Sequence, residues 1–342
     1  MPLPERNIED ELRDFVIREV EESIVYQQSR IEEVRGYTKR YEAKRSISGL
    51  LGWGDDPKKA PKDSPWEGAC YSLDTEVLTK TGWKYIHEVK VGEYVYTMDK
   101  KGVANYGVVT NTLFKPSDKM VHFIGKSIDC LVTLNHRMLI KSKATEDFKF
   151  VEASNFINRQ LCGYIPLTSK FRGSNPLTTY GINTIAYLRF LGWYISEGWA
   201  DYDRKNNTTS SFEIAQSKVN QDKREIIEKD ILAIGTTFKS CEKGYIVHAR
   251  KMPQLLKEEL RGLGICYNKF IPRHVLKMCP EFLEQLLETL IMGDGSIREN
   301  GHRSYWTSSK QLADDVQELC QKIGRRATIK LRQPRKGGTI RG

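Results

Sequence analysis

The sequence lacks the features that mark membrane-spanning, secreted and disulfide-bonded proteins. It contains no run of about 18 apolar residues, which argues against a membrane-spanning helix. Its first residues, Met1-Pro-Leu-Pro-Glu-Arg, contain no apolar core, so no secretory signal is expected. Its seven cysteines are odd in number and never form a Cys-x-x-Cys pair, so neither a disulfide framework nor a zinc ribbon is expected.

The chain is also poor in apolar residues, and its charge is unevenly distributed. Apolar residues make up 39% of the 342 residues, which is low but too high for a disordered chain. Residues 1–69 hold 12 basic and 15 acidic side chains, a net charge of −3, whereas residues 70–342 hold 42 and 29, a net charge of +13. Such a basic segment is typical of a protein that binds a polyanion such as nucleic acid, and an ordinary solvated surface is the alternative.

Patterns along the chain predict several parts. Apolar residues recur mostly every three, four or seven positions through residues 8–45, which predicts a long helix. Residues 49–69 are rich in glycine and proline, which predicts a linker. Short apolar runs broken by glycines predict an all-β region over residues 75–168. Helical segments at Ile182–Ile195 and Pro280–Met292, separated by β-type runs, predict an α+β region in the rest of the chain.

One cysteine and one histidine stand out in the β region. Cys70 follows Gly68-Ala69 and precedes Asp74-Thr75-Glu76-Val77, and a later β-type run ends in Thr133-Leu134-Asn135-His136. Taken separately, each is more often a structural residue. Together the two stretches resemble the Cys block and the Thr-x-x-His block of an intein. The resemblance implies that residues 70–168 are the N-terminal splicing region of an all-β Hint (hedgehog/intein) domain.

The resemblance also implies a chemistry. The Cys70 thiol would attack the Ala69 carbonyl and convert the peptide bond to a thioester, an N–S acyl shift that needs no cofactor. His136, with a pKa near the working pH, would protonate the departing amide nitrogen. Thr133 and Asn135 would hydrogen-bond the scissile carbonyl or its oxyanion. The Ala69–Cys70 bond is thus the expected cleavage junction.

A motif is repeated in the α+β region. Residues 190–198 and 287–295 are both apolar helical segments that close on an acid and a glycine, with Glu197 and Asp294 lying 97 residues apart. A glycine-capped amphipathic helix is the simpler interpretation of either copy alone. The pair, downstream of the intein-like blocks, resembles the LAGLIDADG (DOD-type) homing endonucleases. The copies differ, because Gly192 of the first is Thr289 in the second.

This second resemblance implies an α+β endonuclease over residues 180–342 with two pseudo-symmetric halves whose motif helices pack side by side. Glu197 and Asp294 would hold Mg²⁺ together with DNA phosphates for phosphodiester hydrolysis. Lys269, in a Lys-x-Ile-Pro block, would stabilise developing charge or orient water, and a plain surface lysine is the alternative. Basic residues expected on strands would contact DNA phosphates, namely Lys218, Arg250, Lys251, Arg303 and Lys330.

The expected fold class is therefore multidomain: a helical N-extein arm over residues 1–69, then the Hint region, then the endonuclease. Ser64-Pro65-Trp66-Glu67-Gly68-Ala69 resembles the start of tailed-phage portal proteins, which implies that the extein belongs to a portal oligomer. No histidine is followed by asparagine, and Gly342 falls inside the second endonuclease half, so a truncated precursor is expected. The alternatives are a natural split-intein N-half, a free endonuclease with a non-splicing Hint relic, and an inert or decayed insert in a phage structural protein.

The expected partners and location follow from these resemblances. The DNA partner would be the double-stranded, intein-less allele of the host gene around the Ala69 codon. The protein partner would be the missing C-terminal intein and extein segment. The expected location is the cytoplasm of a bacterial host cell, with a phage gene as the source and no membrane involved, and the spliced extein would enter the virion.

Overall fold

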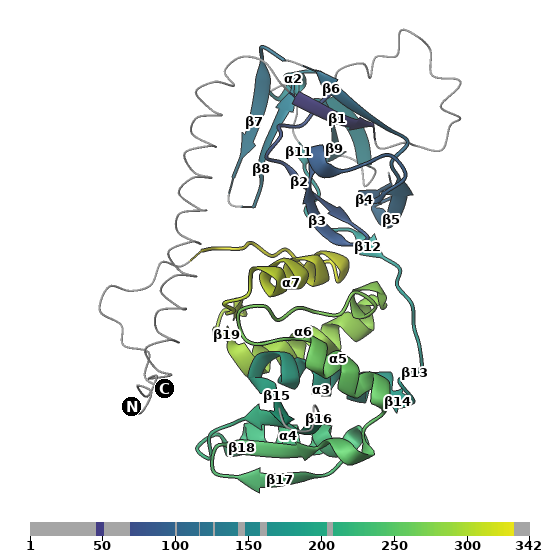
Figure 1. The fold of residues 1–342 in the computed structure, drawn as a ribbon. Coiled ribbons are helices and arrows are strands. Elements are labelled where there is room, and N and C mark those ends of the chain that lie inside the picture. Colours follow the sequence, from purple (N-terminus) through teal and green to yellow (C-terminus); the bar gives the residue numbers. More distant parts are fainter. Residues whose placement is uncertain are drawn as a thin grey trace, which may run out of the picture.

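The computed structural model shows a strand-rich unit stacked on a mixed unit, joined by a short connection (Figure 1). It describes residues 46–50, 69–99, 101–115, 117–125, 127–142, 148–157, 163–203 and 208–331. We call the part up to Phe171 the β unit and residues 178–331 the α/β unit. The predicted helix over residues 8–45 and the linker residues 51–68 lie outside the described residues.

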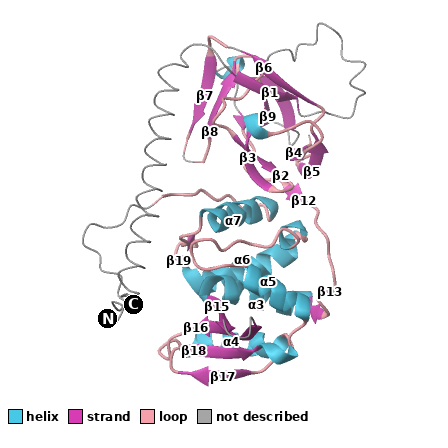
Figure 2. Cartoon of the chain, viewed as in Figure 1, coloured by secondary structure: helices cyan, strands magenta, loops and turns pink. Residues whose placement is uncertain are grey.

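The β unit consists of short strands in several small sheets (Figure 2). The largest sheet has the order β12-β5-β4-β2-β3, in which only the pairing of β12 with β5 is parallel. A second sheet has the order β10-β9-β11, and β7 pairs with β8. The bounds are β2 Glu76–Thr79, β3 Gly82–Tyr85, β4 Tyr94–Met98, β5 Val103–Val108, β6 Asn111–Lys115, β7 Met120–Ile124, β8 Asp129–Thr133, β9 Arg137–Ser142, β10 Phe148–Glu152, β11 Gly163–Tyr164 and β12 Lys170–Phe171, with the one-turn helices η2 Ile86–Glu88 and α2 Ser154–Ile157. These strands confirm the predicted all-β region.

A strand also forms between the expected helix and linker, and it includes the first two residues of the expected linker. Residues Ser46–Leu50 form β1, which pairs antiparallel with β6 from Ser46 opposite Lys115 to Leu50 opposite Asn111. The prediction that the linker begins at residue 49 was therefore wrong for Gly49 and Leu50. The physical reason is that the backbone groups of β6 pair with those of the extended segment that lies beside it.

The α/β unit has a helical centre and a four-stranded antiparallel sheet, ordered β15-β16-β18-β17. No helix in the described part of the chain is long and apolar enough to cross a membrane. The bounds are β13 Thr178–Thr179, β14 Ile182–Asn183, α3 Thr184–Glu197, β15 Gly198–Asp203, β16 Thr208–Ala215, α4 Gln221–Ala233, β17 Phe238–Cys241, β18 Gly244–His248, η3 Ala249–Lys251, α5 Gln254–Gly262, η4 Val275–Lys277, α6 Pro280–Asp294, β19 Gly295–Ile297, β20 Arg303–Tyr305 and α7 Lys310–Lys322.

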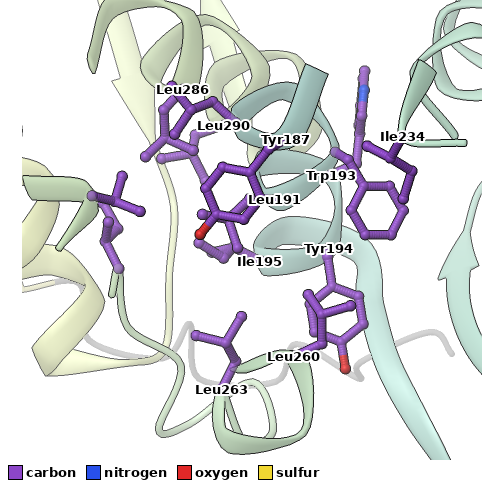
Figure 3. Packing of buried hydrophobic residues seen from close by; sticks show 14 of the residues in the cluster. Tyr187, Leu191, Trp193, Tyr194, Ile195, Ile234, Leu260, Leu263, Leu286 and Leu290 are labelled. Carbon is purple, nitrogen blue, oxygen red and sulfur yellow. The ribbon is translucent and has the colours of Figure 1, made fainter. Parts of the chain in front are cut away.

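Helix α3 forms the middle of the core, and its neighbours pack around it (Figure 3). Tyr187, Leu191 and Trp193 are fully buried, and Leu260 from α5 and Leu286 from α6 lie in the same cluster. The helix begins at Thr184 rather than at the predicted Ile182, because the Asn183 side chain accepts hydrogen bonds from the backbone N–H groups of Ile185 and Ala186. A helix this apolar on all sides is stable only when neighbours cover it completely.

The two repeated helices pack closely through small residues. At Gly192 an added Cβ would lie 2.7 Å from the Thr289 Cβ, and at Gly293 it would lie 2.4 Å from the Ser196 Cβ. Thr289 is the counterpart of Gly192 in the repeat, and Gly293 is the counterpart of Ser196. Each contact therefore joins equivalent positions of α3 and α6, as a pseudo-twofold axis between the helices requires.

A second repeat, which the sequence analysis missed, extends this symmetry beyond the motif helices. In each copy the motif helix leads into a two-stranded hairpin, β15–β16 or β19–β20, and then into α4 or α7. Both of these helices end in an Ile-Gly pair, with a φ of +79° at Gly235 and +74° at Gly324. Both halves therefore share one order of elements.

Replacing Gly293 with alanine is expected to destabilise the α/β unit. The added Cβ would force α3 and α6 apart at Ser196, which costs about 1–3 kcal/mol in a well-packed core. Urea unfolding followed by circular dichroism measures the change. Gly262→Ala is the matched control, because no atom lies within 4 Å of its added Cβ. Equal unfolding midpoints for the two variants would contradict the close packing described here.

Candidate functional site

The repeated acids lie at the ends of the two packed helices. Glu197 is the last residue of α3 and Asp294 the last of α6, and each is followed by a glycine at the helix end. These glycines have φ of −106° and −111°, so they are extended rather than left-handed caps. Their role is close approach, because an added Cβ at Gly198 would lie 2.8 Å from the Tyr194 backbone and one at Gly295 would lie 2.6 Å from the Ile291 backbone.

The Asp294 carboxylate lies within the electrostatic field of Glu197. Burial, followed by the neighbouring Glu197 charge, raises the pKa of Asp294 to about 6. Burial also raises the pKa of Glu197, against the opposing effects of the Lys223 and Lys269 charges. Bringing two carboxylates together away from water disfavours their ionised forms unless positive charge is nearby. The helix packing therefore creates a site that attracts cations.

Lys269 supplies part of that positive charge from a buried position. It is 4% exposed, and its Nζ donates hydrogen bonds to the backbone carbonyls of Tyr194, at 2.6 Å, and of Gly198. Burial lowers its pKa to about 8, although the Asp294 and Glu197 charges oppose this. The alternative of a plain surface lysine was therefore wrong.

Lys223 is a second basic residue of the site, and the sequence analysis missed it. Its Nζ donates to the Gly293 carbonyl at 3.3 Å, and its charge acts on both acids. Helix α4 is held against α3 by Asp230, whose carboxylate accepts from Arg189 and Trp193 at 2.8 Å each. No sequence signal identifies Lys223, because its position depends on this contact between two helices.

The donor set at the helix ends fits a divalent cation in part. Within the described residues, no group of three or more His, Cys, Asp or Glu side chains is placed to hold a metal ion. Glu197 and Asp294 form a pair of hard oxygen donors whose charges disfavour each other, and oxygen donors of this kind suit Mg²⁺. Such a pair needs further oxygen ligands, which phosphate groups of a nucleic acid would provide.

The five residues predicted to bind phosphates lie in different kinds of secondary structure. Only Arg303 lies on a strand, and its guanidinium contacts Glu288 at 3.0 Å and Glu284 at 3.9 Å on α6. The prediction that all five lie on strands was therefore wrong for the other four. Lys218 lies in the turn before α4 and contacts Glu242 at 3.7 Å, Arg250 and Lys251 lie in η3, and Lys330 lies in the irregular segment after α7.

A second candidate site in the β unit contains the predicted cysteine and histidine. The fully buried Cys70 donates its backbone N–H to the Thr133 Oγ1 at 2.8 Å, and its carbonyl accepts from the Thr133 N–H at 2.9 Å. The His136 N–H donates to the Thr133 carbonyl at 3.0 Å, and the Tyr71 ring packs edge-on against the His136 ring at 4.2 Å. Thr133 therefore connects the segments of Cys70 and His136, with Asn135 in the turn between β8 and β9.

Two details of this site differ from expectation. The Thr133 hydroxyl accepts from the amide nitrogen of the Ala69–Cys70 bond, a contact that was not predicted, and the expected contact with the scissile carbonyl or its oxyanion stays a prediction. Burial lowers the pKa of His136 to about 4, so the imidazole is neutral near pH 7 rather than half protonated. Its Nδ1 is buried and has no hydrogen-bond partner among the described residues. A neutral, unpaired imidazole nitrogen is able to accept a proton.

Comparison with protein families identifies a LAGLIDADG-like domain in this chain. The family model matches residues 281–341, which begin in α6 and include Asp294, the β19–β20 hairpin and α7. The match therefore covers the second half-repeat of the α/β unit.

Parts of this chain are similar in sequence to curated proteins whose names have nothing in common. The C-terminal section of an RNA polymerase β subunit from Stigeoclonium helveticum is 27% identical over 71% of this chain and 24% of its own length. A Clp protease proteolytic subunit from Chlamydomonas moewusii is 24% identical over 77% of this chain and 28% of its own length. A DNA polymerase from Thermococcus sp. is 29% identical over 43% of this chain and 8% of its own length. The chain thus spans about a quarter of the length of the first two relatives.

The raised pKa of Asp294 predicts how stability depends on pH. The folded protein binds this proton more tightly than the unfolded chain, because the pKa rises from 3.8 to about 6 on folding. The stability it contributes is complete below about pH 4 and is lost as the pH rises through 6. Asp294→Asn is therefore expected to flatten this fall and to stabilise the metal-free protein at pH 7.

Urea midpoints measured between pH 4 and pH 7 test this expectation. Asp118→Asn, at an exposed position in the β6–β7 turn, is the matched control and should keep the wild-type slope. A wild-type slope in the Asp294 variant as well would contradict the predicted electrostatic coupling.

Proposed function

We propose that this chain is an intein-type homing endonuclease that cleaves double-stranded DNA with a divalent cation. The observation that supports it most directly is the pairing of Glu197 and Asp294 at the ends of α3 and α6, with Lys269 and Lys223 beside them. The LAGLIDADG-like domain at residues 281–341 agrees with this function.

The roles of the residues follow from their positions. Glu197 and Asp294 would hold Mg²⁺ against the DNA phosphates, and the bound ion would activate water and offset charge on the scissile phosphate. Lys269 is fixed by the backbone carbonyls of Tyr194 and Gly198 at the end of α3. From there its charge acts on both acids. Its role would be to stabilise charge that develops during hydrolysis.

Removing either acid is expected to abolish DNA cleavage. Glu197→Gln and Asp294→Asn should each lower the rate at least about 10²-fold, because electrostatic stabilisation at a phosphate is lost. The assay is linearisation of a supercoiled plasmid that contains the host gene with the insert deleted at the Ala69 codon, with Mg²⁺ and then with excess chelator. Glu299→Gln, at an exposed position, is the control. Undiminished cleavage by both acid variants would overturn the proposal.

A second activity, autocatalytic cleavage at Ala69–Cys70, is favoured by the Cys70–Thr133–His136 geometry. The Cys70 sulfur would attack the Ala69 carbonyl carbon, the C–N bond would break and a thioester would form. Since His136 is neutral, it would take the thiol proton first and pass it to the departing nitrogen. The hydrogen bond from the Cys70 N–H to Thr133 holds that nitrogen in place.

Cleavage at this junction is expected to depend on Cys70. Incubation of the full chain with a small thiol should release a fragment of residues 1–69, which mass spectrometry identifies. Cys70→Ala should release none, whereas Cys130→Ala, on the neighbouring strand β8, should behave as the wild type. Release of the same fragment from the Cys70 variant would show that another reaction cleaves the chain.

The relatives support a mobile insert rather than a domain of one host. An RNA polymerase subunit, a protease subunit and a DNA polymerase have no common activity, yet each matches this chain over a minor part of its own length. This distribution is expected when one segment has entered different genes. The finer predictions belong to this proposal: a portal-like N-extein, the intein-less allele as the DNA partner, a missing C-terminal segment and a bacterial cytoplasmic location.

A further inference from the structure

Helix α7 of the α/β unit lies against the β unit, facing β3 and β12 (Figure 1). The indole N–H of Trp83, on β3, donates to the Asp314 carbonyl of α7 at 3.3 Å. The Arg273 guanidinium, in the segment before η4, donates to the Lys80 carbonyl in the β2–β3 turn at 3.2 Å. In both contacts a side chain of one unit donates to a main-chain carbonyl of the other. Each contact therefore depends on the rotamer of one side chain and on the position of the partner's backbone.

A charged cluster is buried at this contact. Glu318 is fully buried, and its carboxylate accepts from Lys322 at 2.6 Å and from Arg273 at 2.6 and 3.0 Å. Aromatic rings of the β unit lie beside it, with the Lys322 Nζ 4.8 Å from the centre of the Phe171 ring and 5.4 Å from that of Tyr106. The rings limit access of water to the Glu318–Lys322 pair, whereas the Arg273 side chain remains 28% exposed. Low local polarity strengthens hydrogen bonds within such a cluster.

The same helix holds the segment that contains Lys269. The Asp315 carboxylate of α7 accepts from the backbone N–H of Ile271 at 2.8 Å, and the hydroxyl of Ser309 donates to the Lys269 carbonyl at 2.6 Å. The Arg273 Nη1 lies 3.8 Å from Asp315 and so connects this pair to the Glu318 cluster. Residues 269–273 are therefore fixed on one side by α7 and, through Arg273, by the β unit.

We propose that the β unit acts as a positioning scaffold for the DNA-cleaving site, in which Arg273 and Asp315 are positioning residues for Lys269. The proposal rests on the endonuclease function proposed above. The order of contacts runs from Lys80, Tyr106 and Phe171, through the Arg273–Glu318–Lys322 cluster and Asp315, to the backbone of Lys269. When the aromatic cover is lost, water enters the cluster, the 269–273 segment loosens and the Lys269 ammonium moves relative to the two acids.

The first test removes the aromatic cover in the full chain. The double variant Tyr106→Ala/Phe171→Ala is expected to cleave the plasmid at least about 10-fold more slowly in single turnover, since small misplacement of a fixed charge has effects of this size. Its Kd for the same DNA, measured with Ca²⁺ in place of Mg²⁺, should stay within about twofold, because neither ring belongs to the DNA-cleaving site. Phe114→Ala, which removes an exposed ring from β6, is the matched control and should change neither quantity.

The second test needs no cleavage activity. Hydrogen exchange of the Ile271 amide, followed by mass spectrometry of peptides that span residues 268–273, should accelerate at least about 10-fold in the double variant and not in the control. This measurement separates the two proposals. A wild-type chain that does not cut DNA would overturn the endonuclease function, yet accelerated exchange at Ile271 would still support the scaffold.

The remaining outcomes are also decisive. Wild-type cleavage and wild-type exchange at Ile271 in the double variant would overturn the proposal. If the double variant unfolds, the conservative pair Trp83→Phe/Tyr106→Phe, which keeps an aromatic ring at both positions, decides instead. It removes the hydrogen bond to the Asp314 carbonyl and the Tyr106 hydroxyl beside Glu318. Faster exchange at Ile271 in this pair supports the scaffold, and unchanged exchange overturns it.

Discussion

The close approach of α3 and α6 is the constraint on which the rest of the α/β unit depends. Gly192 faces Thr289 and Gly293 faces Ser196, so each contact pairs a residue without a Cβ with a small residue at the equivalent position of the other helix. One glycine in each pair is enough for the backbones to approach. The two copies of the motif are therefore free to differ at these positions, provided that one residue of each contacting pair is a glycine.

This packing has an electrostatic consequence that the neighbouring elements offset. Helices that touch at their last turns bring their terminal acids together, and burial raises the pKa of both carboxyls. Lys269 and Lys223 oppose this effect, and each is held by a backbone carbonyl of one motif helix or its closing glycine. Cations near helix C-termini also complement the helix dipole. The same two ammonium groups thus complement the helix ends and limit the rise of the two carboxyl pKa values.

Local patterns in the sequence predicted those parts of the structure that local chemistry determines. The repeated acid and glycine identified Glu197 and Asp294, because a motif helix and its end are specified within a few residues. Lys223 and the burial of Lys269 were not predictable in this way, since both depend on how α3 packs with segments distant in sequence. The low pKa of His136 was missed for the same reason: burial, which follows from tertiary packing, outweighs the ordinary value of the imidazole.

The contacts between the two units have a bearing on how such a segment moves between genes. If the chain is a mobile insert, as proposed above, it cannot rely on a host surface to complete its fold. The charged cluster of Arg273, Glu318 and Lys322 then needs cover from within the same segment. Tyr106 and Phe171 of the β unit provide that cover from within the same stretch of chain. If the two units are inherited together, the cluster keeps its aromatic cover in a new host, whereas a lone α/β unit would expose it to water. Physical dependence of this kind favours retention of both units as one element.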